Sequence, residues 1–478
     1  MNKNNSDVII IGAGSGGLSV GLFLAKVGIK VTMIVRSDKD VGGECLNDGC
    51  VPSKALIHVA RQMQAASEAQ SFGITISGEI DIQKAIGYIH SRQNIIRKHE
   101  NAAWLTEQGI KVVLGEASFA GKNEVAVNGE LFYAKKIVLT TGSKPRKLKV
   151  EGIEKINYFD NENIFHINKL PKKLLVVGGG PIGIELAQAM QRLGSEVTVI
   201  EEGNGILVHD DKTLTDILLK RLVKEGITFY FEVSLQKFTS PNEALVKKKN
   251  GDEFTLSFDA VFVGIGRELI LEPLQLEKAG IEAKDHKIVV DQKLRTTNKD
   301  VLLCGDVAGN LQFSHAAEFQ GRIILNNLFS PLNKKLNNDH MSWVTFTDPE
   351  LATFGLNEKQ LKEREISYEK LEQDFSADDR AITDNYQYSK IILYLNKGNF
   401  FKKEKILGGT MIAPNAGELI QELILANTSG LSTKDIFNKI YPYPTASRIN
   451  QHVIINHKEA GLTHFIKKLL QTAFKIFS

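Results

Sequence analysis

Two cysteines lie five positions apart in the stretch Gly42–Lys54, which reads GGECLNDGCVPSK. Thiols at this spacing can occupy the first turn of a helix, where the helix dipole favours negative charge and lowers a thiol pKa below about 8.5. One sulfur would then be a thiolate, the nucleophilic form, near neutral pH. Because glycines, Pro52 and Lys54 surround the pair, we interpret Cys45 and Cys50 as a redox-active disulfide rather than as two ordinary buried cysteines.

A glycine-rich stretch precedes this pair. The apolar run 8–11 leads into the glycines, and a helical pattern follows over 18–27. Strand, glycines and helix in this order are typical of a dinucleotide site, in which the glycines permit a tight turn, close approach of a pyrophosphate, and close packing of helix on strand. The phosphate charge would lie at the helix N-terminus. The glycines concerned are Gly12, Gly14, Gly16 and Gly17.

The pattern recurs in the middle of the chain. The apolar run 174–177 leads into a second set of glycines, a helical pattern over 184–193 and another apolar run over 197–200. The chain is therefore expected to carry two dinucleotide sites. The second set comprises Gly178, Gly180 and Gly183.

The residue that ends the second strand of each site bears on how ribose is held. In the second site this residue is Glu201, whose carboxylate would accept hydrogen bonds from ribose hydroxyls and repel a 2′-phosphate. No arginine occurs in 202–205, so the sequence favours NADH over NADPH. In the first site the residue is Val35, which accepts no hydrogen bond, and Ser37 and Asp38 are the nearby candidates to replace it.

Length and composition fit a multidomain protein that handles small molecules. The 478 residues suggest about three domains. Basic and acidic side chains nearly cancel, at 59 against 56, which gives no electrostatic signature of nucleic-acid binding. The third cysteine, Cys304, stands alone, so a disulfide scaffold is excluded and a reducing compartment is expected. Since the N-terminal apolar run is too short for a signal peptide, we expect a cytoplasmic protein.

Taken together, these motifs resemble those of the flavoprotein disulfide reductases (class I pyridine nucleotide-disulfide oxidoreductases) along essentially the whole chain, nearest the branch of mercuric reductase and dihydrolipoyl dehydrogenase. The resemblance implies an α/β fold with two Rossmann-like dinucleotide-binding domains, for FAD and NAD, and a C-terminal α+β dimerisation domain. The expected segments are 1–150 (first part of the FAD domain), 151–268 (NAD domain), 269–340 (central FAD segment), 341–460 (interface domain) and 461–478 (basic amphipathic tail).

The resemblance also implies residue roles around FAD. The first glycine site would bind FAD, with Asp306 on the flavin ribityl chain. Ser314 would cap a helix whose N-terminus faces the flavin pyrimidine edge, while His315 is given no chemistry. The further residues assigned to FAD are Gly43, Thr141, Gly142 and Ala308, and Gly266 is assigned to NAD.

The same resemblance orders the redox groups. Cys50 would be the charge-transfer thiol beside the flavin and Cys45 the interchange thiol that meets substrate. Lys54 would lie near flavin N5 and pair with Glu185. Electrons would pass from NADH to FAD, then to the disulfide, and from the dithiol to substrate.

The sequence departs from the family near its C-terminal end. The segment from Ser342 onward resembles the domain that builds a homodimer and lends residues to the partner's site. Disulfide-reducing members carry a His-Pro-Thr segment there, with a glutamate three residues beyond the threonine. In this chain Tyr443 replaces the histidine and Arg448 replaces the glutamate. Tyr443 is the remaining candidate for proton chemistry, although a tyrosine with a pKa of about 10 is a poor base at neutral pH.

This departure bears on the substrate. General acid–base help is worth about 10²–10⁴ in rate, so its loss disfavours acceptors whose leaving thiol needs a proton. An acceptor with a low-pKa leaving group needs less help. We therefore expect a small electrophile, such as a hypohalous or pseudohypohalous oxidant, a metal ion or a quinone.

Two sets of alternatives stay open. The first is dihydrolipoyl dehydrogenase or mercuric reductase activity proper, although no cysteine follows Cys304 to supply the additional C-terminal pair of mercuric reductases. The second is a flavin-only quinone reductase or a flavin-binding sensor without turnover. No resident metal is expected in any of these cases.

The stretch 462–477 has apolar residues at helical spacing, interleaved with Lys467, Lys468 and Lys475. It is predicted to be a basic amphipathic helix that either docks on the dimer or contacts a membrane surface. No apolar run approaches the ~18 residues of a membrane-spanning helix.

Overall fold

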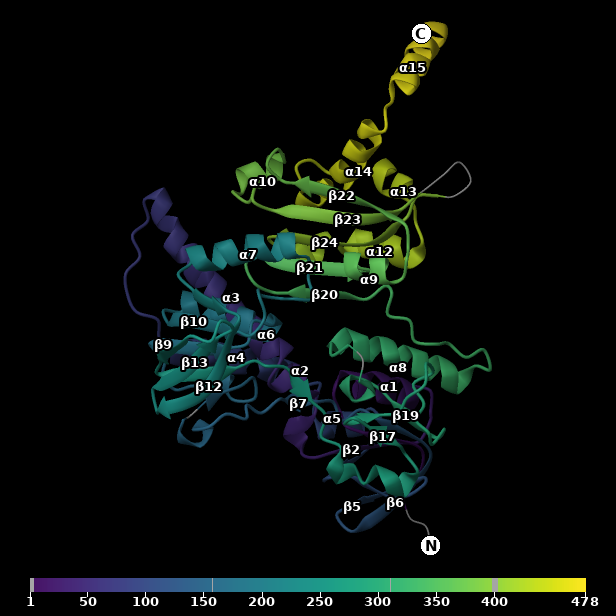
Figure 1. Cartoon of the computed structure of the whole chain (residues 1–478). Helices are drawn as coiled ribbons and strands as arrows, with labels where there is room; N and C mark the ends of the chain where they lie inside the picture. Colours follow the sequence, from purple (N-terminus) through teal and green to yellow (C-terminus); the bar gives the residue numbers. More distant parts are fainter. Residues whose placement is uncertain (1–3, 157, 310, 398–402) are drawn as a thin grey trace. The chain divides into compact units, whose positions relative to one another are not determined.

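The computed structural model describes residues 4–156, 158–309, 311–397 and 403–478 (Figure 1). The chain forms two compact units. The first comprises Met1–Asn204 and Glu225–Asn337, and the second comprises Gly205–Lys224 and Asn338–Ser478.

The first unit contains a sheet of seven strands whose central strands are parallel. The apolar residues of β1 are buried, as expected of a strand covered on both faces. The strand order is β3-β2-β1-β6-β5-β4, with β19 also paired to β6, and β4 and β5 are antiparallel. The strands are β1 (Asn5–Ile11), β2 (Val31–Val35), β3 (Lys111–Leu114), β4 (Ser118–Gly121), β5 (Glu124–Val127), β6 (Glu130–Leu139) and β19 (Val301–Leu303).

A second sheet in this unit is wholly parallel, in the order β11-β10-β9-β15-β8. Its strands are β8 (Tyr158–Phe159), β9 (Lys173–Val177), β10 (Glu196–Glu201), β11 (Thr228–Phe231) and β15 (Ala260–Val263). An antiparallel sheet of three strands follows β11, formed by β12 (Val233–Ser240), β13 (Glu243–Lys248) and β14 (Glu253–Ser257). Two Rossmann-like sheets are thus present, which confirms this part of the predicted fold class.

Helices of the first unit carry the two cysteines, Lys54 and Glu185. A helix follows each glycine motif, and α3 packs against both α4 and α6. The helices are α1 (Ser15–Lys26), α2 (Gly43–Asn47), α3 (Cys50–Glu68), α4 (Ile82–Arg97), α5 (Ala102–Glu107), α6 (Pro181–Arg192) and α8 (Ser314–Phe329). Short strand pairs complete the unit: β7 (Lys144–Pro145) with β16 (Arg267–Glu268), and β17 (Ala283–Lys284) with β18 (Lys287–Ile288).

The second unit is built on an antiparallel sheet in the order β20-β21-β24-β23-β22. This sheet agrees with the predicted α+β dimerisation domain. Its strands are β20 (Ser342–Thr345), β21 (Glu350–Gly355), β22 (Tyr368–Asp374), β23 (Lys390–Asn396) and β24 (Ile406–Ala413). Its helices are α7 (Lys212–Lys224), α9 (Glu358–Glu363), α10 (Asp379–Thr383), α11 (Ala416–Leu419), α12 (Gln421–Ser429), α13 (Thr433–Asn438), α14 (Ile449–Ala460) and α15 (His464–Phe477).

Helix α7 comes from an earlier part of the chain than the rest of the second unit. It contacts β21 and β24. Just before it, Asp210 accepts hydrogen bonds from Trp343 Nε1 at 2.8 Å and Thr353 Oγ1 at 2.9 Å. Segment 205–224, although it falls within the range expected for the NAD domain, therefore belongs to the second unit.

Candidate active site

The two cysteines lie in successive helices. Cys45 is in the short helix α2, and Cys50 is the first residue of α3. The sequence suggested that both thiols could share one helical turn, but Gly49 interrupts the helix with φ −125° and ψ −113°. Cys50 therefore begins the 19-residue helix α3, whose N-terminus no side chain caps, whereas Cys45 is the third residue of the five-residue helix α2.

The surroundings of the two cysteines shift their thiol pKa values in opposite directions. Both thiols are free in the structure. The pKa of Cys50 lies below its usual range because its thiolate accepts a hydrogen bond from Cys45 and another from Ser314, with Lys54 nearby. The pKa of Cys45 is raised, first by the same hydrogen bond to Cys50 and then by burial. These opposite directions favour Cys50 as the thiolate and Cys45 as the protonated thiol when both are reduced.

Ser314 contacts the thiol instead of capping its helix. The prediction that Ser314 is an N-cap is wrong, because α8 begins at Ser314 and the extended residue Phe313 precedes it without a capping hydrogen bond. The Ser314 hydroxyl lies 3.7 Å from Cys50 Sγ. The backbone N–H groups at the start of α8 are consequently not capped by a side chain.

Lys54 and Glu185 form an ion pair, with 2.7 Å between Lys54 Nζ and Glu185 Oε2. Lys54 is one helical turn beyond Cys50 on α3, and Glu185 is on α6, which packs against α3. Glu185 is buried, and Lys54 offsets the cost of burying its charge. The structure brings together the two residues that the resemblance paired, and their role at the flavin remains a prediction.

Helix α4 fixes the backbone that carries the cysteines. Gln93 is buried and donates from Nε2 to the carbonyl oxygens of Leu46 and Asn47, at 2.9 and 2.7 Å. Arg97 donates to the Asn47 side chain at 2.6 Å. The segment between the two cysteines is therefore held in place before any substrate arrives.

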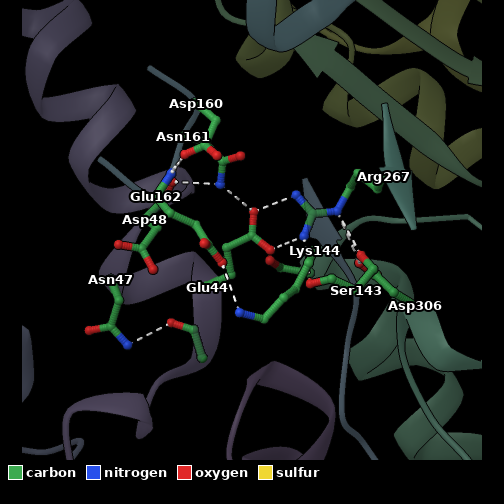
Figure 2. Close-up of polar contacts among 12 residues, drawn as sticks. Glu44, Asn47, Asp48, Ser143, Lys144, Asp160, Asn161, Glu162, Arg267 and Asp306 are labelled. Atoms are coloured by element: carbon green, nitrogen blue, oxygen red, sulfur yellow. Dashed lines mark hydrogen bonds and ion pairs between the residues drawn. The ribbon is translucent and has the colours of Figure 1, made fainter. Parts of the chain in front are cut away.

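A polar network that includes Glu44 joins distant parts of the chain (Figure 2). Arg267 on β16 makes a bidentate ion pair with Glu44, the residue before Cys45. Its Nε donates to Ser143 Oγ at 2.6 Å, and Ser143 Oγ donates to Asp306 Oδ2 at 2.5 Å. The buried side chain of Asn161 donates to Glu44 Oε1 at 2.8 Å. Asp306, the predicted FAD ligand, is thus connected to the residue beside Cys45.

Sequence reasoning did not identify Glu44 and Asn161 as part of the site. A glutamate beside a cysteine carries no signal of its own, because its partner Arg267 is 223 positions away. Burial raises the pKa of Glu44 despite the opposing effect of Arg267. Burial also raises the pKa of Asp48, in the segment between the cysteines, to about 7, with Glu162 and Glu44 adding to the effect.

We expect Arg267→Gln to destabilise the protein by about 2–4 kcal/mol, because it leaves the Glu44 carboxylate largely buried and unpaired. The matched control is Arg36→Gln, which breaks an exposed i,i+4 pair with Asp40 and should cost below about 1 kcal/mol. Thermal melts of the FAD-loaded protein provide the comparison. Adding Glu44→Gln to Arg267→Gln should recover much of the loss, and equal shifts for the two arginine variants would contradict the structural role of this pair.

The first glycine motif forms a tight turn in which Gly12 and Gly17 lie too close to backbone atoms for any side chain to fit. A Cβ atom on Gly12 would lie 2.3 Å from the Thr140 carbonyl oxygen, and one on Gly17 would lie 2.2 Å from the Gly12 carbonyl oxygen. Helix α1 begins after Gly14 with no side-chain cap and no acidic residue in its first turn, whereas α4 is capped by Asp81. The N–H groups of α1 are therefore available to a pyrophosphate, so the residues fit FAD.

The other residues assigned to FAD line adjoining segments. A Cβ atom on Gly16 would lie 2.8 Å from Cys304 Sγ, and one on Gly43 would lie 2.6 Å from Gly14 Cα. Ala308 is buried, Thr141 is exposed and Gly142 has φ +70°. Their contacts with FAD remain predictions.

The adenosine end of this site lacks a carboxylate at its usual place. Val35 ends β2 and is buried. Asp38 accepts from the Ala102 N–H at 2.7 Å, and the Ser37 hydroxyl donates to Asp40 at 2.7 Å. Both of the nearby candidates are thus engaged in local contacts.

The second glycine motif repeats this geometry at α6. A Cβ atom on Gly183 would lie 2.3 Å from the Gly178 carbonyl oxygen, and α6 begins after Gly180 without a side-chain cap. Glu201 ends β10, where its carboxylate accepts from the N–H groups of Gly179 and Gly203, both at 2.6 Å. Gly266, with φ +102°, precedes Arg267.

Tyr443 lies in the second unit and is exposed. Its hydroxyl donates to Asp379 Oδ2 at 3.0 Å, and the Arg448 guanidinium lies 5.4 Å from its ring centroid. The hydrogen bond to Asp379 raises the pKa of Tyr443. Within this unit the phenol therefore acts as a hydrogen-bond donor and is not activated as a base.

The chain is similar to known proteins of one oxidoreductase family along most of its length. The family model for pyridine nucleotide-disulphide oxidoreductases matches residues 6–321, and the model for the dimerisation domain of the same family matches residues 341–453. A mercuric reductase of Lysinibacillus sphaericus is 30% identical over 93% of this chain and 81% of that protein. A dihydrolipoyl dehydrogenase of Buchnera aphidicola is 32% identical over 92% of this chain and 93% of that protein.

Among solved structures, the HOCl-induced flavoprotein disulfide reductase RclA from Escherichia coli is similar, with a TM-score of 0.82 and 25% sequence identity. The match covers 94% of this chain and 99% of that one.

Proposed function

This chain belongs to the pyridine nucleotide-disulphide oxidoreductase family and is an FAD-dependent oxidoreductase, and we propose that it passes electrons from NADH through the Cys45–Cys50 pair to a small electrophile. The matching dimerisation domain supports a homodimer. The preference for NADH over NADPH rests on Glu201, whose carboxylate ends β10 beside the second glycine motif.

Several groups would hold and serve FAD. The loop from Gly12 to Gly17 and the N-terminus of α1 would bind the phosphates of FAD. Asp306 would accept a hydrogen bond from a hydroxyl group of the ribityl chain. Bound FAD would supply the transfer of an electron pair from the nicotinamide to the disulfide. The uncapped N-terminus of α8 would stabilise negative charge nearby.

The reduced pair can complete the reaction without a histidine. For an oxidant HOX, the Cys50 thiolate would first take the Cys45 proton. The Cys45 thiolate would then form a bond to X, and the released hydroxide would take the proton back from Cys50 and become water. The Cys50 thiolate would then attack Cys45 sulfur, form the disulfide and release X as an anion. The low pKa of Cys50 supports this order, because its thiolate is present near neutral pH and is the group that closes the disulfide.

The observation that carries the choice of acceptor is Tyr443. Where a disulfide reductase of this family would have a histidine, this chain has a phenol that donates to Asp379 and whose pKa is raised. Arg448 occupies the place of the orienting glutamate. An acceptor that releases a stable anion needs no such base, which favours an electrophile over a thiol or disulfide substrate.

The test is an anaerobic titration of the FAD-loaded protein with NADH. We expect uptake of four electrons, two on the disulfide and two on the flavin. A long-wavelength absorbance band from a thiolate beside oxidised flavin should appear with the first two electrons and disappear when the flavin is reduced. Two electrons without the band would overturn the dithiol route and favour a flavin-only quinone reductase or a sensor. Repeating the titration with NADPH tests the nucleotide preference.

A further inference from the structure

Helix α15, from His464 to Phe477, is an apolar element of the second unit whose described side chains are largely exposed. None of its residues is buried, and in Figure 1 it extends away from α14. Three phenylalanines illustrate the exposure, with 75%, 72% and 88% of their surface accessible: Phe465, Phe474 and Phe477. A helix with so many exposed apolar side chains needs a surface to cover them.

The residues of α15 separate cleanly into two faces. At about 100° per residue, the apolar side chains fall on roughly one half of the helix circumference and the polar side chains on the other. The apolar face comprises Phe465, Ile466, Leu469, Leu470, Ala473, Phe474, Ile476 and Phe477. The polar face comprises His464, Lys467, Lys468, Gln471, Thr472 and Lys475.

The charge on this helix has one sign. Residues 461–478 include three lysines and no aspartate or glutamate, whereas the whole chain balances 59 basic against 56 acidic residues. Docking on a second copy of the chain would cover the apolar face but does not require an opposite face free of carboxylates. An anionic lipid surface accounts for both properties, because acyl chains take up the apolar face while lysines meet the headgroups.

We infer that α15 binds the surface of an anionic membrane and lies in the interface plane. None of the described helices is long and apolar enough to cross a membrane, so the inferred contact is peripheral. Thr463 caps the start of α15 through a hydrogen bond from the Ile466 N–H, which defines the helix before it reaches a membrane. This inference does not depend on which acceptor the enzyme reduces.

The experiment is co-sedimentation of the full-length, FAD-loaded protein with vesicles of phosphatidylcholine, with and without about one third phosphatidylglycerol. We expect binding to the anionic vesicles only, and a fall of at least about fivefold when the salt concentration is raised several-fold. Equal binding to neutral vesicles, or none to either kind, would overturn the inference.

Matched variants separate insertion from charge. Leu469→Glu with Leu470→Glu places two carboxylates on the apolar face, and Gln471→Glu with Thr472→Glu places the same charge on the polar face. We expect the apolar-face variant to lose vesicle binding at least about tenfold more than the polar-face variant. Light scattering tests the alternative that α15 docks on a second copy of the chain. If the apolar-face variant changes the oligomeric state and the parent protein binds no vesicles, that alternative holds and the inference fails.

Discussion

Replacing either Cys45 or Cys50 is expected to lower the NADH-dependent reduction of the proposed electrophile by about 10³-fold or more, because each replacement removes one of the two sulfurs that the reaction needs. The two variants should nevertheless differ in one property. Cys45→Ser keeps the Cys50 thiolate, with Ser314 and Lys54 still beside it, whereas Cys50→Ser removes the thiolate. Only Cys45→Ser should therefore show the long-wavelength absorbance band without added NADH.

The pH dependence of alkylation in Cys45→Ser tests the assignment independently of turnover. In the parent protein the pKa of Cys50 is lowered to about 6, and the hydrogen bond from Cys45 is the largest cause. In Cys45→Ser that thiol is gone but Ser314 and Lys54 remain, so the reaction of Cys50 with a thiol reagent should rise with pH through a midpoint below that of an ordinary thiol and level off above it. An ordinary thiol would show its midpoint near 8.5. Cys304 provides an internal control, because it is buried and burial raises its pKa to about 12. A midpoint above 8 for Cys50 would contradict the proposed activation.

The second large effect is expected in the choice of acceptor. Oxidation of dihydrolipoamide with NAD, or reduction of glutathione disulfide with NADH, should be slower than reduction of an electrophile such as a hypohalous acid by about 10²–10⁴. The cause is the replacement of the acid–base pair by Tyr443 and Arg448. Steady-state kcat/KM values for a panel of acceptors provide the measurement. Dihydrolipoamide turnover equal to that of the best electrophile would contradict the proposal.

A designed reversal sharpens this comparison. Tyr443→His with Arg448→Glu restores the two residue types that the family uses, and should raise the rate with dihydrolipoamide by at least about tenfold. Tyr443→Phe is the matched control, since it removes the hydroxyl that donates to Asp379 but adds no base. We expect Tyr443→Phe to leave electrophile reduction within about twofold of the parent enzyme. A tenfold loss in this variant would instead indicate proton chemistry at Tyr443.

Local patterns in the sequence were sufficient to predict the glycine motifs and the cysteine pair. Strand, glycines and helix are adjacent in the chain, so their order reveals the turn that Gly12 and Gly17 must make. The pairing of Lys54 with Glu185 came from the family resemblance, and the structure places them 2.7 Å apart.

Features that depend on distant segments were not predictable in this way. The contact of Glu44 with Arg267 arises because β16 pairs with β7, which brings a residue from late in the unit to the helix that carries Cys45. The separation of the two cysteines into two helices depends on the backbone angles of Gly49, which its residue type permits but does not dictate. The prediction for Ser314 was wrong because serine is among the residues preferred at an N-cap, and its type alone does not distinguish the cap from the first helical residue.

The position of α7 affects how the chain can be divided and in what order it can fold. The chain enters the second unit at Gly205, leaves it after Lys224 and returns at Asn338, so neither unit is one continuous segment. A fragment beginning at residue 338 would lack α7, and the surfaces of β21 and β24 that α7 contacts would be exposed. During synthesis α7 would be made more than a hundred residues before β21, so it could not pack against β21 and β24 until those strands had been made. The two units should accordingly behave as interdependent parts in synthesis and in limited proteolysis, and neither should be separable by a single cut.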